Sequence, residues 1–243
     1  MDDNPTLAEN LRSVRARIAA AARRAGRPAD AVRLVAVSKT QPAERVRAAF
    51  AAGVTDFGEN RVEEAAPKIA AVGPGPVWHL IGHVQSRKAG PAAAHFALVH
   101  SVDSLKLAER LNRFAGEAGR PAYRRPAYPR ALPQRPLPVL LECNLTGEPS
   151  KAGFAAAEPK KWDTLLAEWE KLAALPHLRV QGLMTMAALG ATPDALRATF
   201  AALRQLRDQG IRNRLGCRRD DDPVEWRPIG NAGKAVAHNH VDV

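Results

Sequence analysis

Strand-like and helix-like segments alternate along most of this chain, and this alternation constrains the fold more than any other feature. Short apolar runs rich in branched residues predict strands, and apolar residues at every third or fourth position predict helices. The predicted strands cover residues 32–38, 54–57, 77–81, 96–102, 138–145 and 180–184. The predicted helices cover residues 5–24, 43–52, 61–72, 86–94, 105–118, 162–174 and 194–208. Such alternation indicates an α/β fold with a parallel sheet, and the regular unit length favours a (β/α)8 barrel resembling a TIM barrel.

Two segments interrupt this rhythm. Residues 119–138 are rich in proline and arginine, which suits neither a regular helix nor a central strand, so we expect an exposed loop insertion there. Residues 211–243 show neither strand alternation nor a helical stripe, so the last two strands of an eight-stranded barrel lack a convincing sequence. We therefore expect one barrel domain over residues 1–243, with an atypical tail from residue 211.

Composition narrows the class of protein. Two cysteines, Cys143 and Cys217, are too few for a disulfide scaffold and suit a reducing, cytoplasmic location. No apolar run is long enough to span a membrane. The net charge of +11 suggests phosphate-bearing partners, but the basic residues are spread along the chain without interleaved aromatic residues, so we expect no nucleic-acid partner.

Several predicted strands end in an amine or a small polar group. In a barrel the carboxyl ends of the strands carry the functional groups. Lys39 follows the first strand; it could simply reach water there, but an amine that apolar neighbours partly shield from water can attack an aldehyde, so we expect a reactive amine. The candidates at the other strand ends are Asn60, His79, Ser101, Asn144, Met184 and Thr185. Each has an ordinary structural explanation by itself, so it is their shared position that indicates a binding site.

Six ordered motifs carry a specific resemblance to a known family. They are LVAVSKTQP, FGENRVEEAAPKI, WHLIGHVQSRK, HSVDS, LECNLTGEPSKAGF and VQGLMTM. From about Asn10 to Gly210 the chain resembles the pyridoxal phosphate (PLP) homeostasis protein family, small proteins shaped like the N-terminal barrel of alanine racemase. The resemblance implies a PLP-binding barrel in which Lys39 holds PLP as a Schiff base. It also implies a role in vitamin B6 homeostasis as a carrier rather than as an enzyme.

The chemistry of PLP agrees with the candidate residues. PLP carries an aldehyde for an amine, a ring that needs apolar walls and amide contacts, and a phosphate that needs backbone N–H groups. We expect Asn60 and Asn144 to bond the ring substituents. We expect Val37, Met184 and the region of His79 to wall the ring.

The tail departs from the family pattern. The family's Ser-Met-Gly-Met-Ser and Val-Arg-Ile-Gly segments, which form the phosphate cradle and place an arginine at the ring nitrogen, do not occur here. Each charge-assisted hydrogen bond lost in this way is worth about 1.5–3 kcal/mol, so a variant with impaired PLP binding is one alternative. Lys88 and Lys151 also match family positions, although solvated surface lysines explain them equally well.

Other functions remain open to test. A PLP-dependent racemase needs a second base, and the only tyrosines, Tyr123 and Tyr128, lie in the insertion. A lysine-dependent aldolase needs an acid or base beside its amine, for which Glu59 is the obvious carboxylate. The arginine-rich stretch at 120–135 would suit RNA or an acidic surface.

Metal binding is not expected. His79 and His83 lie on a strand and its turn, where their spacing does not place them on one face, and His238 and His240 lie in the atypical tail. The prediction is therefore a monomeric, cytoplasmic PLP-binding protein without catalytic turnover that serves PLP-dependent apoenzymes and has no metal, nucleic-acid or membrane partner.

Overall fold

The structure, a computed structural model, describes residues 6–117, 136–213 and 236–237. Within these residues strands and helices alternate. The strands are β1 (Ala36–Val37), β2 (Asp56–Glu59), β3 (Val77–Leu80), β4 (Leu98–Val102), β5 (Leu137–Asn144), β6 (Phe154–Ala155), β7 (Leu178–Thr185) and β8 (Val236–Ala237). The helices are α1 (Leu7–Arg24), α2 (Ala43–Ala51), α3 (Val62–Val72), α4 (Ala89–His95), α5 (Leu105–Glu117), α6 (Trp162–Ala173) and α7 (Pro193–Asn213), with short 3-10 turns η1 (Ser86–Lys88) and η2 (Pro159–Lys161).

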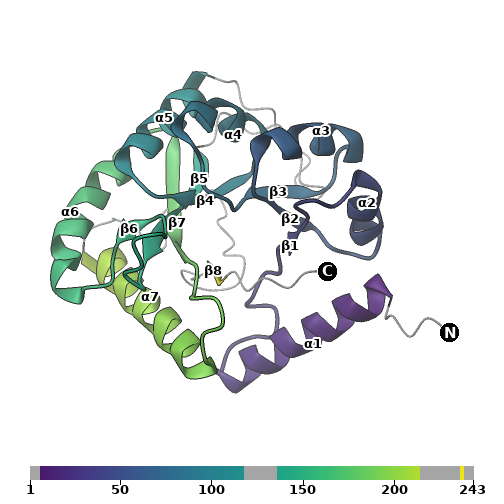
Figure 1. Cartoon of the computed structure of the whole chain (residues 1–243), viewed down its shortest axis with the longest axis horizontal. Helices are drawn as coiled ribbons and strands as arrows, with labels where there is room; N and C mark the ends of the chain where they lie inside the picture. The colour runs from purple at the N-terminus through teal and green to yellow at the C-terminus, as the bar shows by residue number, and fades with distance from the viewer. Residues whose placement is uncertain (1–5, 118–135, 214–235, 238–243) are drawn as a thin grey trace.

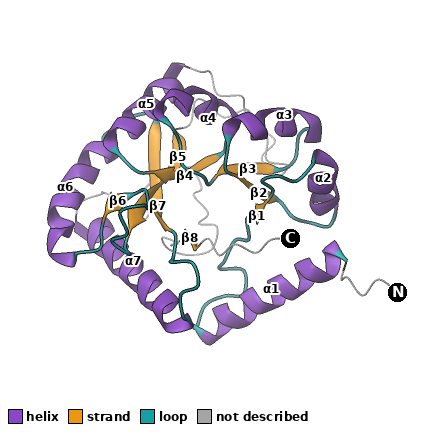
Figure 2. Ribbon diagram, in the orientation of Figure 1, coloured by secondary structure: helices purple, strands orange, loops and turns teal. Residues whose placement is uncertain are grey.

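Every strand pairing among the described residues is parallel. The strand order is β1-β2-β3-β4-β5-β7-β8, and β6 pairs with the end of β5. Parallel neighbours need crossover connections, and helices supply most of them. Figure 1 shows the helices following one another around the outside, and Figure 2 shows the strands inside this ring. The predicted TIM-barrel-like α/β fold is confirmed, although the described pairings do not join β8 to β1.

The main hydrophobic core lies between the strands and the surrounding helices. Phe57 on β2 and Trp78 and Leu80 on β3 belong to this core and are almost fully buried. Successive residues of a strand point to opposite faces, so Asp56 and His79 point into the barrel. Their side chains come within 2.9 Å of each other there. The interior of the barrel is therefore polar at this level.

Helices α2 and α3 begin just after the loops that follow β1 and β2. Pro42 precedes α2 with the extended backbone that is usual for an N-cap residue. In α3 the buried residues are Val62, Ala65 and Lys68, spaced three apart, so they share one face of the helix. A lysine thus lies on the buried face of α3, toward the strands.

Two short strands were missed by the sequence analysis. β6 pairs with β5, and β8 lies in the tail, where we expected no convincing strand. That expectation was wrong at Val236–Ala237, which pairs in parallel with Met184 and Thr185 of β7. A two-residue strand is held by backbone hydrogen bonds to an existing edge and needs no alternating pattern, so periodicity could not reveal it.

Several predictions fall outside the described residues. These are the loop character of residues 119–135, the placement of Tyr123, Tyr128, Cys217, His238 and His240, and the arginine-rich stretch. Residues 136–138 are described, and β5 already begins at Leu137, so the insertion ends before its predicted limit. Among the described helices none combines the length and apolar character needed to cross a membrane. The described residues likewise contain no group of three or more potential metal ligands placed to hold an ion.

Candidate cofactor-binding site

Lys39 follows directly on the carboxyl end of β1. The amide of Ser38 donates to the carbonyl of Gly58 over 2.9 Å, which extends the contact between the first two strands by one residue. The chain then turns, because Thr40 adopts a left-handed backbone conformation with φ of 62° and Gln41 donates back to the carbonyl of Ser38. Lys39 is partly exposed, and within the described residues its amine makes no hydrogen bond or ion pair. A primary amine is thus available at this end of the barrel.

The ends of β2, β3 and β4 meet at three residues, namely Asn60, Gly82 and Ser101. A side chain at Gly82 would place its Cβ only 2.5 Å from the carbonyl oxygen of Asn60, so the two segments touch where only glycine fits. The hydroxyl of Ser101 donates to the carbonyl of Gly82 over 2.6 Å. Asn60 itself is half-buried, and its side chain makes no hydrogen bond within the described part of the chain. Three of the predicted strand ends are therefore neighbours.

His79 lies deeper in the barrel than these residues. It is 2% exposed, with Nε2 at 2.9 Å from Oδ1 of Asp56 and Nδ1 at 2.9 Å from Nε2 of His100. Arg33 approaches the same Asp56 oxygen at 3.1 Å. Burial alone would raise the pKa of Asp56, but the hydrogen bond from His79 and the charge of Arg33 together lower it. His79 is thus engaged within a buried polar chain, and its predicted contact with a ligand ring stays a prediction.

The candidates on β5 and β7 are bonded to the protein's own backbone. Asn144 donates to the carbonyls of Glu148 and Lys151 over 2.8 and 3.3 Å and accepts from the amide of Gly147 over 3.0 Å. Thr185 donates to the carbonyl of Cys143 over 2.7 Å. In this arrangement Asn144 closes the loop that follows β5 and Thr185 ties β7 to β5.

Met184 lies beside a carboxyl group that the sequence analysis overlooked. Met184 is fully buried and pairs in register with Glu142 of β5, which is 6% exposed. Oε2 of Glu142 has no hydrogen-bond partner among the described residues. Burial, and then the negative charge of Asp103, raises the pKa of Glu142 to about 7. The signal was present in the sequence as a single charge within the apolar strand LPVLLECN.

Other expected residues have clear partners. Glu59 is fully buried and is bonded to Ser38 and Lys68, so it is not an exposed acid beside the amine of Lys39. Lys88 forms an ion pair with Glu63. Lys151 forms one with Glu148 at 2.8 Å.

These groups fit part of a PLP molecule. An available amine, a half-buried amide, a buried thioether and an unpartnered buried carboxyl occur at or near the carboxyl ends of parallel strands. They suit the aldehyde and the ring of such a ligand. Donors for its phosphate are not identified among the described residues.

Comparison with known proteins identifies the family. Residues 10–242 match the family described as alanine racemase, N-terminal domain. The chain is 46% identical over 202 residues to the pyridoxal phosphate homeostasis protein of Pseudomonas aeruginosa, covering 83% of this chain and 79% of that protein. The chain belongs to the pyridoxal phosphate homeostasis protein family. Its relative of the same name in Escherichia coli K12 is 40% identical over 186 residues, covering 75% of this chain and 70% of that protein.

Solved structures agree with this assignment. The structure of PipY from Synechococcus elongatus without PLP has a TM-score of 0.68 at 39% identity, and the structure with PLP bound has 0.65 at 37%. Each comparison covers 84% of this chain and 82% of PipY. Alanine racemase from Corynebacterium glutamicum, at 17% identity and a TM-score of 0.54, covers 85% of this chain and 52% of that one and shares the fold. The family match also extends past Gly210, where we expected the resemblance to end.

Proposed function

We propose that this protein binds PLP through the amine of Lys39 and takes part in vitamin B6 homeostasis as a carrier without catalytic turnover. The position of Lys39 carries this proposal, since its amine lies at the carboxyl end of β1 and has no partner among the described residues. The PLP-bound structure of PipY supports it, as do the names of the curated relatives.

Individual residues have distinct parts in this proposal. When bound, PLP supplies an aldehyde, which a primary amine takes up with loss of water. Asn60 offers an amide to the ring substituents, and Met184 offers an apolar surface to the ring. Gly82 allows the segment after β3 to lie directly against the backbone of Asn60 because it carries no side chain. Asp56 and His100 hold His79 in one orientation beneath them.

We propose that the protein has no turnover because a second base opposite Lys39 is not identified among the described residues. Racemisation requires an acid–base group opposite the lysine, and the described part of the chain contains no tyrosine. Glu59, the carboxylate that an aldolase would use, is enclosed by Ser38 and Lys68. Assays of the purified protein with alanine, and with keto acids or sugar phosphates, test this part of the proposal. Turnover in either assay contradicts it.

The partners and location extend the proposal further. We propose a monomer in the cytoplasm that delivers PLP to PLP-dependent apoenzymes. Light scattering behind a sizing column measures the first point, and cell fractionation measures the second. Transfer of PLP to an apoenzyme, followed by the return of that enzyme's activity, tests the delivery role.

Covalent trapping is the direct test of PLP binding. The protein is incubated with PLP, reduced with borohydride and mapped by peptide mass spectrometry. We expect one near-stoichiometric adduct on Lys39, absent from Lys39→Ala and retained in the control Lys106→Ala on α5. No adduct, or scattered labelling of surface lysines, overturns the proposal and favours a variant with impaired PLP binding.

A further inference from the structure

A buried ion pair joins α3 to the strands beside Lys39. Nζ of Lys68 on α3 lies 2.7 Å from Oε1 of Glu59 at the end of β2, and the two side chains are 7% and 0% exposed. The same ammonium donates to the carbonyl oxygen of Ser38 over 2.7 Å. The hydroxyl of Ser38 in turn donates to Oε1 of Glu59 over 2.7 Å. The residue before Lys39 is thus bonded through both its backbone and its side chain.

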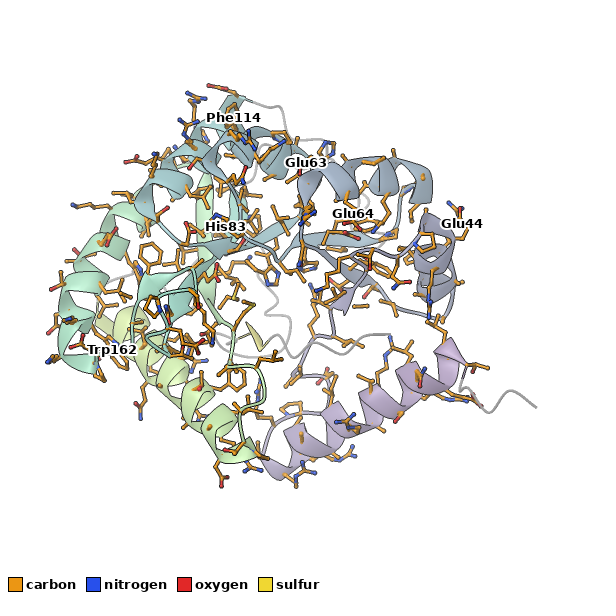
Figure 3. The ribbon with its side chains drawn as sticks, in the orientation of Figure 1. Glu44, Glu63, Glu64, His83, Phe114 and Trp162 are labelled. Carbon is orange, nitrogen blue, oxygen red and sulfur yellow. The ribbon has the colours of Figure 1, made fainter. Side chains whose placement is uncertain are left out.

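A second arm of this network reaches the residue after Lys39. Glu64 lies one turn before Lys68 on α3, with Oε1 at 3.1 Å from the Lys68 ammonium. The same oxygen accepts a hydrogen bond from the backbone amide of Thr40. Figure 3 labels Glu64 between its helix and the strands. The buried ammonium of Lys68 therefore holds both sequence neighbours of Lys39. It bonds to Ser38 directly and to Thr40 through Glu64.

The backbone beside Lys39 needs such support. Thr40 has φ of 62°, a left-handed conformation that is rare for a β-branched residue and persists only where surrounding contacts hold it. Its amide is held by Glu64, and its hydroxyl donates to the carbonyl of Lys39 over 2.6 Å. Burial alone would raise the pKa of Glu64, but the hydrogen bonds from Thr40 and Lys68 lower it below its usual value. Glu64 therefore stays an anionic acceptor at neutral pH.

We propose that Lys68, Glu59 and Glu64 form a brace that positions the amine of Lys39 by fixing the backbone of residues 38–40. Lys68 is a positioning residue in this arrangement and does not itself bind the ligand, because its ammonium is enclosed by two carboxylates and a carbonyl. The inference rests on the proposed role of Lys39 in PLP binding. It adds the part of the protein that determines where that amine is held.

The first test removes the outer arm alone. Glu64→Ala deletes the acceptor for Thr40 and leaves the buried pair of Lys68 and Glu59 in place. The matched control is Glu44→Ala on α2, an exposed glutamate that pairs with Arg47 and is also labelled in Figure 3. Hydrogen exchange of residues 38–42 in the unliganded protein reports on the brace independently of PLP. We expect Glu64→Ala to raise the exchange of the Thr40 amide about tenfold or more, with no change in Glu44→Ala.

PLP affinity is the second readout. We expect Glu64→Ala to weaken PLP binding by roughly tenfold, because a displaced amine reacts less readily, and Glu64→Gln to restore part of the loss through its amide oxygen. Faster exchange with unchanged PLP affinity overturns the inference, and so does unchanged exchange. If wild-type Lys39 gives no adduct, the proposed function fails, while the exchange experiment still reports on the brace itself.

A double variant tests the inner pair. Lys68→Met with Glu59→Gln removes both buried charges together, so neither is left unpaired. We expect a folded protein, shown by circular dichroism, with faster exchange at residues 38–40 and weaker PLP binding. A folded double variant with wild-type exchange and PLP affinity overturns the inference. If the double variant does not fold, the exchange and PLP affinity of Glu64→Ala decide whether the inference holds.

Discussion

At the end of β1 the polar groups on either side of Lys39 bond across three elements, whereas at the end of β5 the amide of Asn144 bonds to the backbone of its own loop. The first arrangement fixes the backbone on either side of Lys39, and the Lys39 amine has no partner among the described residues. The second uses the functional side chain itself as the structural support. Residues at equivalent strand ends thus differ in whether their side chains are available to a ligand. The hydrogen bonds around each residue show whether its side chain is available or supports the fold.

The largest effect on stability is expected on the Lys39 side. Lys68→Ala leaves the fully buried carboxyl of Glu59 without its cation, which costs about 3–5 kcal/mol of unfolding free energy. Urea denaturation of the protein without PLP measures this loss. Lys161→Ala, which breaks an exposed pair with Glu158, is the control and should cost far less, because water screens the pair. Equal losses in the two variants would remove the distinction between the brace and a surface ion pair.

Glu142 on β5 is expected to make the stability of the folded protein depend on pH. The pKa of Glu142 in the folded protein is raised to about 7, above its ordinary value near 4.5, so the folded state binds this proton more tightly than the unfolded state. The contribution of Glu142 to the free energy of unfolding is therefore fully present below pH 4.5. It is lost as the pH rises to about 7 and above, which lowers the free energy of unfolding by about 3 kcal/mol.

Glu142→Gln sharpens this prediction because it keeps the shape and removes the titration. Urea midpoints measured between pH 4.5 and 8 should fall less steeply for the variant than for the wild type. Parallel curves for the two proteins would show that Glu142 titrates normally. Glu168→Gln on α6, which makes the same substitution at a partly exposed glutamate, is the matched control.

The smallest effect is expected at the loop after β5. Asn144→Ala removes three hydrogen bonds between this side chain and the loop backbone, and we expect a loss of about 1–3 kcal/mol. Thermal melting measures the loss. If Asn144 also contacts the ligand as predicted, PLP affinity should fall in Asn144→Ala. Asn144→Asp keeps one acceptor and should retain part of that affinity. A normal affinity in Asn144→Ala would restrict this residue to its structural role.

The motifs around Lys39 and the alternation of strands and helices were readable in the sequence because both depend on local order. A lysine after VRLVAVS and a proline-capped helix are features of adjacent residues, as is the apolar periodicity that predicts each βα unit. The sequence accordingly determined the fold class, the family and the candidate amine. It also placed most strands within a few residues, although the first predicted strand, 32–38, shortens to Ala36–Val37.

The tertiary structure decided which polar residues are available and which support the fold. Lys68 and Glu59 lie nine positions apart on different elements and meet because α3 packs against the end of β2. His79 finds Asp56 and His100 only when three strands pair in register. Likewise β8 exists through pairing with β7, from which it is separated by about fifty residues of sequence. Such contacts depend on packing between distant segments, and no local pattern encodes the distance or direction of a side chain across them.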